Sequence, residues 1–264
     1  DDRFVARLLH WFEQHGRHDL PWQHPRTPYR VWLSEIMLQQ TQVKTATPYF
    51  ERFVAALPSL QALAAAPLDD VLALWSGLGY YARARNLHAA AQRCVELHGG
   101  DLPRDIEALT ALPGIGRSTA AAILSQAWGD RHAILDGNVK RVLTRLHAID
   151  GDPTQSATLS ALWDLADTLT PTERCADYTQ AIMDLGATLC TRSRPACPRP
   201  PLLPPGRART ARAAGHRFDL RGARATRALH RRGTGRIPRR LRGTAACRPR
   251  RNRGRARTAA SRLR

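Results

Sequence analysis

Hydrophobic residues in positions 1–190 recur every three to four residues, with almost no alternation of period two. This spacing predicts short amphipathic helices, and Pro, Gly and Asp signals separate them. The predicted helices are FVARLLHWFEQ, YRVWLSEIMLQQT, TPYFERFVAAL, PLDDVLALWSGL, YARARNLHAAAQRCVELH, DIEALTAL, GRSTAAAILSQAW, GNVKRVLTRLHAI, SATLSALWDLADTL and RCADYTQAIMDLGATLC. About ten short helices with tight connections predict an all-α globule.

The pattern stops near Pro198. Residues 199–264 hold 22 of the 41 basic residues, all of them Arg, and one acid, Asp219, so their net charge is 22 − 1 = +21. Such a segment cannot bury enough apolar surface to offset its ordering entropy, and we predict a disordered basic tail. It is either a natural nucleic-acid-binding arm or the product of a shifted reading frame in a GC-rich gene. The loss of periodicity inside a cysteine motif favours the shifted frame.

The rest of the composition indicates a protein of the cell interior. No apolar run is long enough to span a bilayer, and the first residues do not resemble a signal peptide. Five cysteines without a regular framework fit a reducing compartment. We therefore expect a cytoplasmic protein with no membrane partner.

The motif LPGIGRSTA at 112–120 predicts a tight turn between two helices. Gly114 and Gly116 allow close approach of the backbone to a ligand. The free N–H groups of the turn and the start of the next helix form a seat for phosphate, where Ser118 can add a hydroxyl contact. The motif therefore indicates a helix-hairpin-helix that grips DNA, although an ordinary helix–helix turn has the same residues.

Two carboxylates are candidates for acid–base chemistry. Asp136 stands at a helix start about twenty residues after the hairpin, where its simplest role is an N-cap. Glu35 shares its predicted helix with Trp32 and Leu38. Apolar neighbours raise the pKa of a carboxyl and make it a proton donor near neutrality. The alternative for Glu35 is a solvated helix glutamate.

A hairpin followed at this interval by an Asp resembles the helix-hairpin-helix Gly/Pro-Asp superfamily of DNA glycosylases. With LPW (20–22), WLSEIMLQQTQV (32–43), GLGYYARARNLH (77–88) and MDLGATLC (183–190), residues 3–198 closely resemble adenine DNA glycosylases of the MutY type.

The resemblance implies an all-α helix-hairpin-helix DNA glycosylase fold, with two helical subdomains flanking a DNA-binding cleft. Residues 20–130 would form a six-helix subdomain with the hairpin. Residues 1–19 and 131–198 would form the second, before the tail at 199–264.

The resemblance also implies an activity, the release of adenine mispaired with 8-oxoguanine or guanine in double-stranded DNA. The protein would act as a monomer, associated with the bacterial nucleoid through DNA. Glu35 matches the acid that protonates adenine, Asp136 the carboxylate that stabilises the sugar cation, and Asn138 the residue that orients both and the water. The matched DNA- and substrate-binding positions are Arg17, Leu20, Trp22, Gln40, Tyr80, Gly114, Gly116, Ser118, Lys140 and Gln180.

Some of these positions carry specific expectations. Gln40 and Tyr80 match residues that wedge into the duplex opposite a flipped base. Arg83 and Arg85 are each interpreted as a contact to the DNA backbone or as a solvated helix charge. Ser118 stands where strand-cleaving members carry a nucleophilic lysine, so the resemblance implies an enzyme without imine chemistry.

The cysteine loop departs from the family pattern. Cys190 and Cys197 begin a C-x6-C-x2-C-x5-C spacing, but the next two positions are Pro200 and Gly206. The resemblance implies a [4Fe–4S] cluster, which normally takes four thiolates, so we expect incomplete occupancy. The family's second, Nudix-like domain, which recognises 8-oxoguanine, has no counterpart after Pro198.

Two other functions stay open at this stage. One is an endonuclease III-like glycosylase for oxidised pyrimidines, against which Ser118 and the WLSEIMLQQTQ helix argue. The other is a catalytically impaired DNA-binding remnant, retained for its hairpin and its basic tail.

Overall fold

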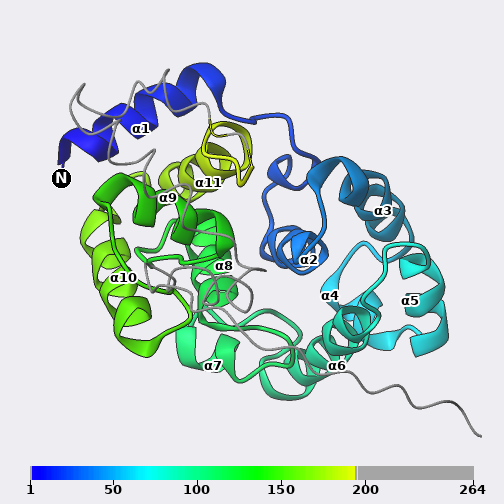
Figure 1. Cartoon of the computed structure of the whole chain (residues 1–264). Helices are drawn as coiled ribbons and strands as arrows, with labels where there is room; N and C mark the ends of the chain where they lie inside the picture. The colour runs from blue at the N-terminus through cyan, green and yellow to red at the C-terminus, as the bar shows by residue number, and fades with distance from the viewer. Residues whose placement is uncertain (1, 194, 196–264) are drawn as a thin grey trace, which may run out of the picture. The chain divides into compact units, whose positions relative to one another are not determined.

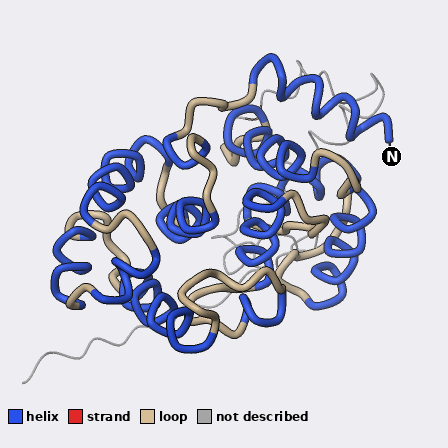
Figure 2. The backbone as a smooth tube through the Cα atoms, turned by 180° about the vertical axis from the view of Figure 1, so that it is seen from behind, coloured by secondary structure: helices blue, strands red, loops and turns tan. Residues whose placement is uncertain are grey.

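The computed structural model describes residues 2–193 and 195, which form helices joined by loops, with no strand among them (Figure 2). This confirms the all-α prediction. The elements in chain order are α1 (Asp2–His15), the 3-10 turn η1 (Pro21–Gln23), α2 (Pro28–Leu38), α3 (Val43–Ala56), α4 (Leu60–Ala65), α5 (Leu68–Trp75), α6 (Ala82–Leu97), α7 (Ile106–Thr110), α8 (Arg117–Trp128), α9 (Gly137–His147), α10 (Ser156–Leu169), α11 (Cys175–Asp184) and the π-helical turn η2 (Leu185–Leu189).

Capping residues explain where several helices begin. Thr27 Oγ1 accepts a hydrogen bond of 3.3 Å from the Arg30 N–H, and proline follows as the first residue of α2. Ser59 caps α4 in the same way. Helix α4 was not predicted, because six residues between two prolines are too short to show a period. The stretch 20–130 therefore holds seven α-helices among the described residues, α2 to α8, instead of six.

Two hydrophobic clusters form the interior of the described chain. The first is built by α2 to α8 around large side chains such as Trp32, Phe50 and Trp75. The second is built mainly by α1 and α9 to α11, with Leu8 and Tyr178 among its buried residues. The first and last parts of the described chain thus share one core.

Helix α8 lies between the two clusters and packs against α2 on one side and α11 on the other (Figure 1). Ile123 and Leu124 belong to the first cluster, whereas Ala121 and Ala122 belong to the second. Side chains of α8 can therefore reach α2, which carries Glu35.

The sequence predicts a regular helix up to Cys190, but the structure does not continue α11 that far. After Asp184 the chain widens into the π-helical turn η2. Such turns are frequent at functional sites.

No helix of the described range has the length and apolar character needed to cross a membrane. The predicted tail at 199–264 lies outside the described residues.

Candidate active site

Glu35 extends from α2 toward α8 and is only partly exposed. The Gln126 amide nitrogen donates a hydrogen bond of 2.9 Å to Glu35 Oε1. The pKa of Glu35 is raised to about 7, first by burial and then by the charge of Asp136, against the lowering effect of the Gln126 hydrogen bond. This confirms the expected raised pKa. A carboxyl of this kind holds a proton near neutrality and can donate it.

Asp136 is the N-cap of α9, and it also acts electrostatically on Glu35. Its Oδ1 accepts from the Val139 N–H at 2.7 Å, and Asn138 Nδ2 donates to its Oδ2 at 3.3 Å. Burial raises the pKa of Asp136, while these hydrogen bonds and the charge of Arg141 oppose the shift. The repulsion between the two carboxyls raises the pKa of Glu35. The charge of Asp136 therefore favours the protonated form of Glu35, which makes Glu35 the candidate acid and Asp136 the candidate anion.

Asn138 is held in place by α9 and η2. Arg141 Nη2 donates to Asn138 Oδ1 and to the Gly186 carbonyl, both at 2.7 Å. A Cβ on Gly186 would lie 2.6 Å from the Asn138 Cβ, so only glycine allows this approach. The glycine of the MDLG motif thus lets η2 press against the start of α9, and Arg141 fixes the amide that contacts Asp136.

The predicted hairpin joins α7 to α8. Gly114 has φ 78°, and a Cβ there would lie 2.9 Å from the Asn86 Cβ on α6. Gly116, the N-cap of α8, is exposed and has open space around it. Because the first N–H groups of a helix have no intrahelical acceptor, this end of α8 suits an anion. Contact with DNA phosphate stays a prediction for both glycines.

Ser118 has a role inside the protein that the sequence did not reveal. Its Oγ accepts a hydrogen bond of 3.0 Å from the Leu135 N–H. Leu135 directly precedes Asp136, so the hairpin helix holds the segment that delivers the carboxylate. The Ser118 O–H can still donate a hydrogen bond. The predicted contact of Ser118 with a DNA phosphate would use this donor.

The two predicted wedge residues share an uncommon backbone conformation. Gln40 has φ 58° and Tyr80 has φ 50°, both in the left-handed region that non-glycine residues rarely occupy. Both side chains are exposed, Tyr80 to 58%. Surrounding structure must hold such conformations, which cluster at functional sites.

Arg83 provides that support, and its interpretation as a DNA contact or a solvated charge is wrong. The side chain is buried. Its Nη1 donates to the Gln39 carbonyl at 2.6 Å and its Nη2 to the Gly79 carbonyl at 3.2 Å, the residues just before Gln40 and Tyr80. The guanidinium also lies 5.3 Å from the centre of the Tyr80 ring. The buried Arg83 side chain therefore links the backbone segment before Gln40 to the segment before Tyr80.

Arg83→Met is expected to lower the free energy of unfolding by at least about 2 kcal/mol, because each buried carbonyl left unpaired costs about 1–3 kcal/mol. Urea denaturation followed by circular dichroism measures the change. Arg85→Met is the matched control, since Arg85 is exposed on the same helix and should change stability by less than about 0.5 kcal/mol. Equal stability of the two variants would contradict the role given to Arg83.

Three of the predicted substrate-binding residues, Arg17, Trp22 and Gln180, make contacts within the protein. Arg17 donates through its backbone N–H and its Nε to the buried carboxylate of Asp184, both at 2.8 Å. Gln180 Nε2 donates to the same carboxylate at 2.8 Å. Trp22 is buried with its ring against Phe50. Contact of these side chains with a base stays a prediction.

Leu20 and Lys140 complete the predicted set. Leu20 is buried in the first hydrophobic cluster, at the start of η1. Lys140 lies in the first turn of α9 and is partly exposed, within the helix that Asp136 caps. The structure thus brings Lys140 to the same helix start as Asp136 and Asn138, while Leu20 is part of the first hydrophobic cluster.

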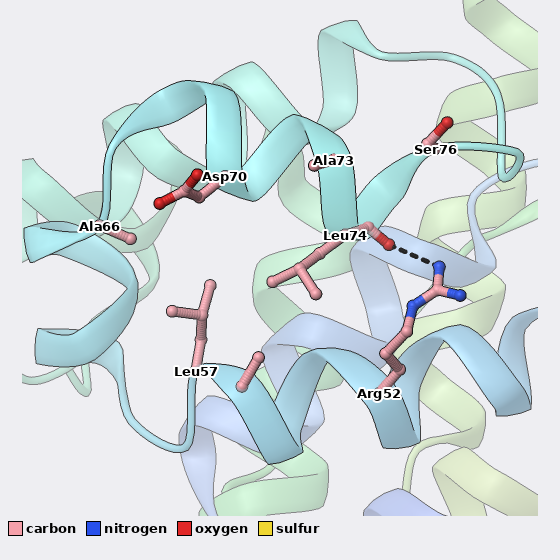
Figure 3. A pocket seen from close by; sticks show the side chains of 8 residues that line it. Arg52, Leu57, Ala66, Asp70, Ala73, Leu74 and Ser76 are labelled. Atoms are coloured by element: carbon pink, nitrogen blue, oxygen red, sulfur yellow. Dashed lines mark hydrogen bonds between the residues drawn. The ribbon is translucent and has the colours of Figure 1, made fainter.

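A hollow of about 700 Å³ lies between α3 and α5 (Figure 3). Arg52 at its edge donates to the Leu74 carbonyl at 2.8 Å, and most of the other lining is apolar. Its lining includes neither carboxyl of the Glu35–Asp136 pair. The hollow is therefore separate from the candidate active site.

A family model described as HhH-GPD superfamily base excision DNA repair protein matches residues 33–167. The chain belongs to the HhH-GPD superfamily. The matched range contains Glu35, the hairpin and Asp136, so the HhH-GPD region coincides with the candidate active site.

Curated relatives of this HhH-GPD chain carry the name adenine DNA glycosylase. The protein of Buchnera aphidicola subsp. Acyrthosiphon pisum (strain APS) is 45% identical over 199 residues, which are 75% of this chain and 57% of the relative. The Homo sapiens protein is 46% identical over 208 residues, 75% of this chain and 38% of the relative. The chain thus spans little more than half the length of the bacterial relative.

Solved structures share the HhH-GPD fold. A thermostable thymine-DNA glycosylase aligns with a TM-score of 0.68 at 29% identity, over 75% of this chain and 91% of that one. A non-covalent endonuclease III–DNA complex aligns with a TM-score of 0.67 at 23% identity, over 79% and 94% of the two chains. The likeness at 23% identity concerns the fold alone.

The cysteine loop of the HhH-GPD chain does not fit a [4Fe–4S] cluster. Over the described range, no three His, Cys, Asp or Glu side chains gather as metal ligands. Cys190 is described and free, whereas Cys197 lies outside the described residues. The other two positions of the spacing, Pro200 and Gly206, carry no thiol. Two thiols do not satisfy a cluster that takes four.

Two arginines of α9 donate hydrogen bonds to the start of the cysteine loop. Arg145 is buried and its Nη1 donates to the Thr191 carbonyl at 2.8 Å and to Cys190 Sγ at 3.4 Å. Arg141 Nε donates to the Cys190 carbonyl at 2.7 Å. Sequence reasoning missed both arginines, because a GNVKRVLTRL helix gives no sign of which basic side chains bond to the cysteine loop.

Proposed function

We propose that this chain is a monofunctional adenine DNA glycosylase that releases adenine mispaired with 8-oxoguanine or guanine in double-stranded DNA. The observation that carries the proposal is the pair of carboxyls Glu35 and Asp136, in which burial and the charge of Asp136 raise the pKa of Glu35 to about 7. Glycosidic bond cleavage needs such a pair, with one carboxyl acting as acid and the other as anion. The names of the curated relatives support adenine as the base released.

DNA would be held through its backbone and opened at the mismatch. Gly114 and Gly116 would present N–H groups to phosphate, and Lys140 would contact a further phosphate. Gln40 and Tyr80 would enter the duplex where the adenine leaves the stack. The cleft between segment 20–130 and the remaining helices would receive the DNA, and one copy of the chain would suffice.

The chemical step would follow from the two carboxyls. Glu35 donates its proton to adenine N7 while the C1′–N9 bond breaks and its electron pair stays on adenine. The negative charge of Asp136 stabilises the sugar cation, and Asn138 orients the attacking water. The water adds to C1′ and loses a proton, which restores the acid form of Glu35. Adenine and an abasic site are the products.

The bond-cleaving activity should stop at the abasic site, because Ser118 has no amine to form an imine with the sugar. A duplex labelled on the adenine strand of an A:8-oxoguanine pair should remain unbroken after incubation with the protein. It should then break at that adenine when alkali is added, while an A:T duplex stays intact. Strand breakage without alkali at every turnover would contradict the monofunctional mechanism, and an alkali-resistant strand would contradict the proposed function.

A further inference from the structure

Gln126 is a polar residue in the most buried part of α8. Its side chain is 4% exposed, and its neighbours Ile123 and Leu124 belong to the hydrophobic core. A buried amide without a partner costs free energy, so its hydrogen bonds indicate its purpose. The hydrogen bond that Gln126 makes through Nε2 reaches Glu35, 91 residues earlier in the chain, at 2.9 Å.

The direction of this hydrogen bond favours one Glu35 oxygen as the carrier of the proton. The C=O oxygen of a protonated carboxyl is a better acceptor than its O–H oxygen, so an N–H that donates to Oε1 favours Oε1 as the C=O oxygen. The acidic proton then belongs on Oε2. The same hydrogen bond strengthens when the carboxyl becomes an anion, because hydrogen bonds to charged groups are the stronger ones.

We propose that Gln126 is a positioning residue for Glu35, which orients the carboxyl so that Oε2 presents the proton to the departing base and which stabilises the carboxylate left behind. This inference rests on the proposed function. It adds Gln126, which lies outside the hairpin motif at 112–120 and is neither of the two carboxylates. It assigns Gln126 no contact with DNA.

None of the charged side chains described around Glu35 stabilises its carboxylate, so the Gln126 amide has this role. Asp136 acts on Glu35 with a repulsive charge that raises its pKa. Arg83, which extends from α6 to α2, donates to the backbone carbonyls of Ile36, Met37 and Gln39 instead. The charged residues of α3, including Lys44 and Glu51, are exposed. Gln126 is thus the group that lowers the pKa of Glu35 against burial and Asp136.

The test replaces Gln126 with Met, which has similar length and no N–H donor. Gln126→Met should lower the single-turnover rate of adenine release from an A:8-oxoguanine duplex by about tenfold to hundredfold. It should also move the alkaline limb of the pH–rate profile upward, because the hydrogen bond that favours the ionised form is lost. Ile123→Val is the control for packing on the same helix, and should change neither the rate nor the limb.

A second measurement does not depend on the activity. Protein with a ¹³C-labelled glutamate carboxyl is titrated by NMR without DNA, and Glu35 is assigned by its absence in Glu35→Gln. Gln126→Met should raise the pKa of Glu35. If wild-type protein releases no adenine but this shift occurs, the hydrogen bond stands and the proposed function fails.

Three results would overturn the role of Gln126. The first is a rate within twofold of wild type with an unmoved pKa. The second is a slower rate with an unmoved pKa, which would assign the loss to packing alone. The third is a lower pKa in Gln126→Met, which would mean that the amide oxygen, and not Nε2, faces the carboxyl.

Discussion

Glu35→Gln is expected to lower the single-turnover rate of adenine release by about 10²–10⁴-fold, the usual contribution of a general acid. The amide has the shape of the acid but no proton to give at neutral pH. Because the fold and the hairpin are unchanged, affinity for the duplex should stay within a few-fold of wild type. Quenched excision assays with protein in excess over DNA give the rate, and fluorescence anisotropy gives the affinity.

Glu51→Gln is the matched control, since Glu51 is an exposed glutamate on α3 and the charge change is the same. It should excise adenine at the wild-type rate. Near-wild-type excision by Glu35→Gln would remove Glu35 from the mechanism. A large loss of duplex affinity in that variant would instead indicate a role in binding.

Asp136→Asn is the second substitution with a large expected effect, and it separates the two roles of this residue. Asparagine caps a helix about as well as aspartate, so α9 and the free energy of unfolding should be preserved. The negative charge that stabilises the sugar cation is lost, so we expect the excision rate to fall by about 10²–10⁴-fold, as for other removed electrostatic and acid–base groups. Thermal unfolding and single-turnover excision are measured on the same preparation.

Asp105→Asn is its control, because Asp105 caps α7 through a hydrogen bond of 2.7 Å from the Ala108 N–H. That change should affect neither stability nor excision by a measurable amount. If Asp136→Asn is equally harmless, Asp136 is a cap and nothing more.

The fold and the two carboxyls could be predicted because their signals are local. The helical period and the apolar neighbours of Glu35 lie within one or two turns of chain. Helix α4 escaped detection because two prolines leave it only six residues. The π-helical turn after Asp184 escaped because a helical period does not distinguish one wide turn from a regular one.

The partners of the site residues could not be predicted, since they lie far apart in the chain. Gln126 meets Glu35 across 91 positions, and Arg17 meets Asp184 across 167. Hydrophobic spacing shows that α8 is buried but not which of its polar side chains faces α2. The same limit applies to Arg83, whose sequence context is that of an exposed helix.

The measurement that tests the central claim most directly is the pH dependence of single-turnover adenine release from an A:8-oxoguanine duplex. Glu35 must be protonated and Asp136 ionised, so the rate should fall on both sides of an optimum. On the alkaline side it should fall tenfold per pH unit above an apparent pKa near 7, as Glu35 loses its proton. DNA phosphates close to Glu35 would move this limb upward and not downward. A rate that is constant or rising between about pH 6 and pH 9 would contradict the assignment of Glu35 as the acid.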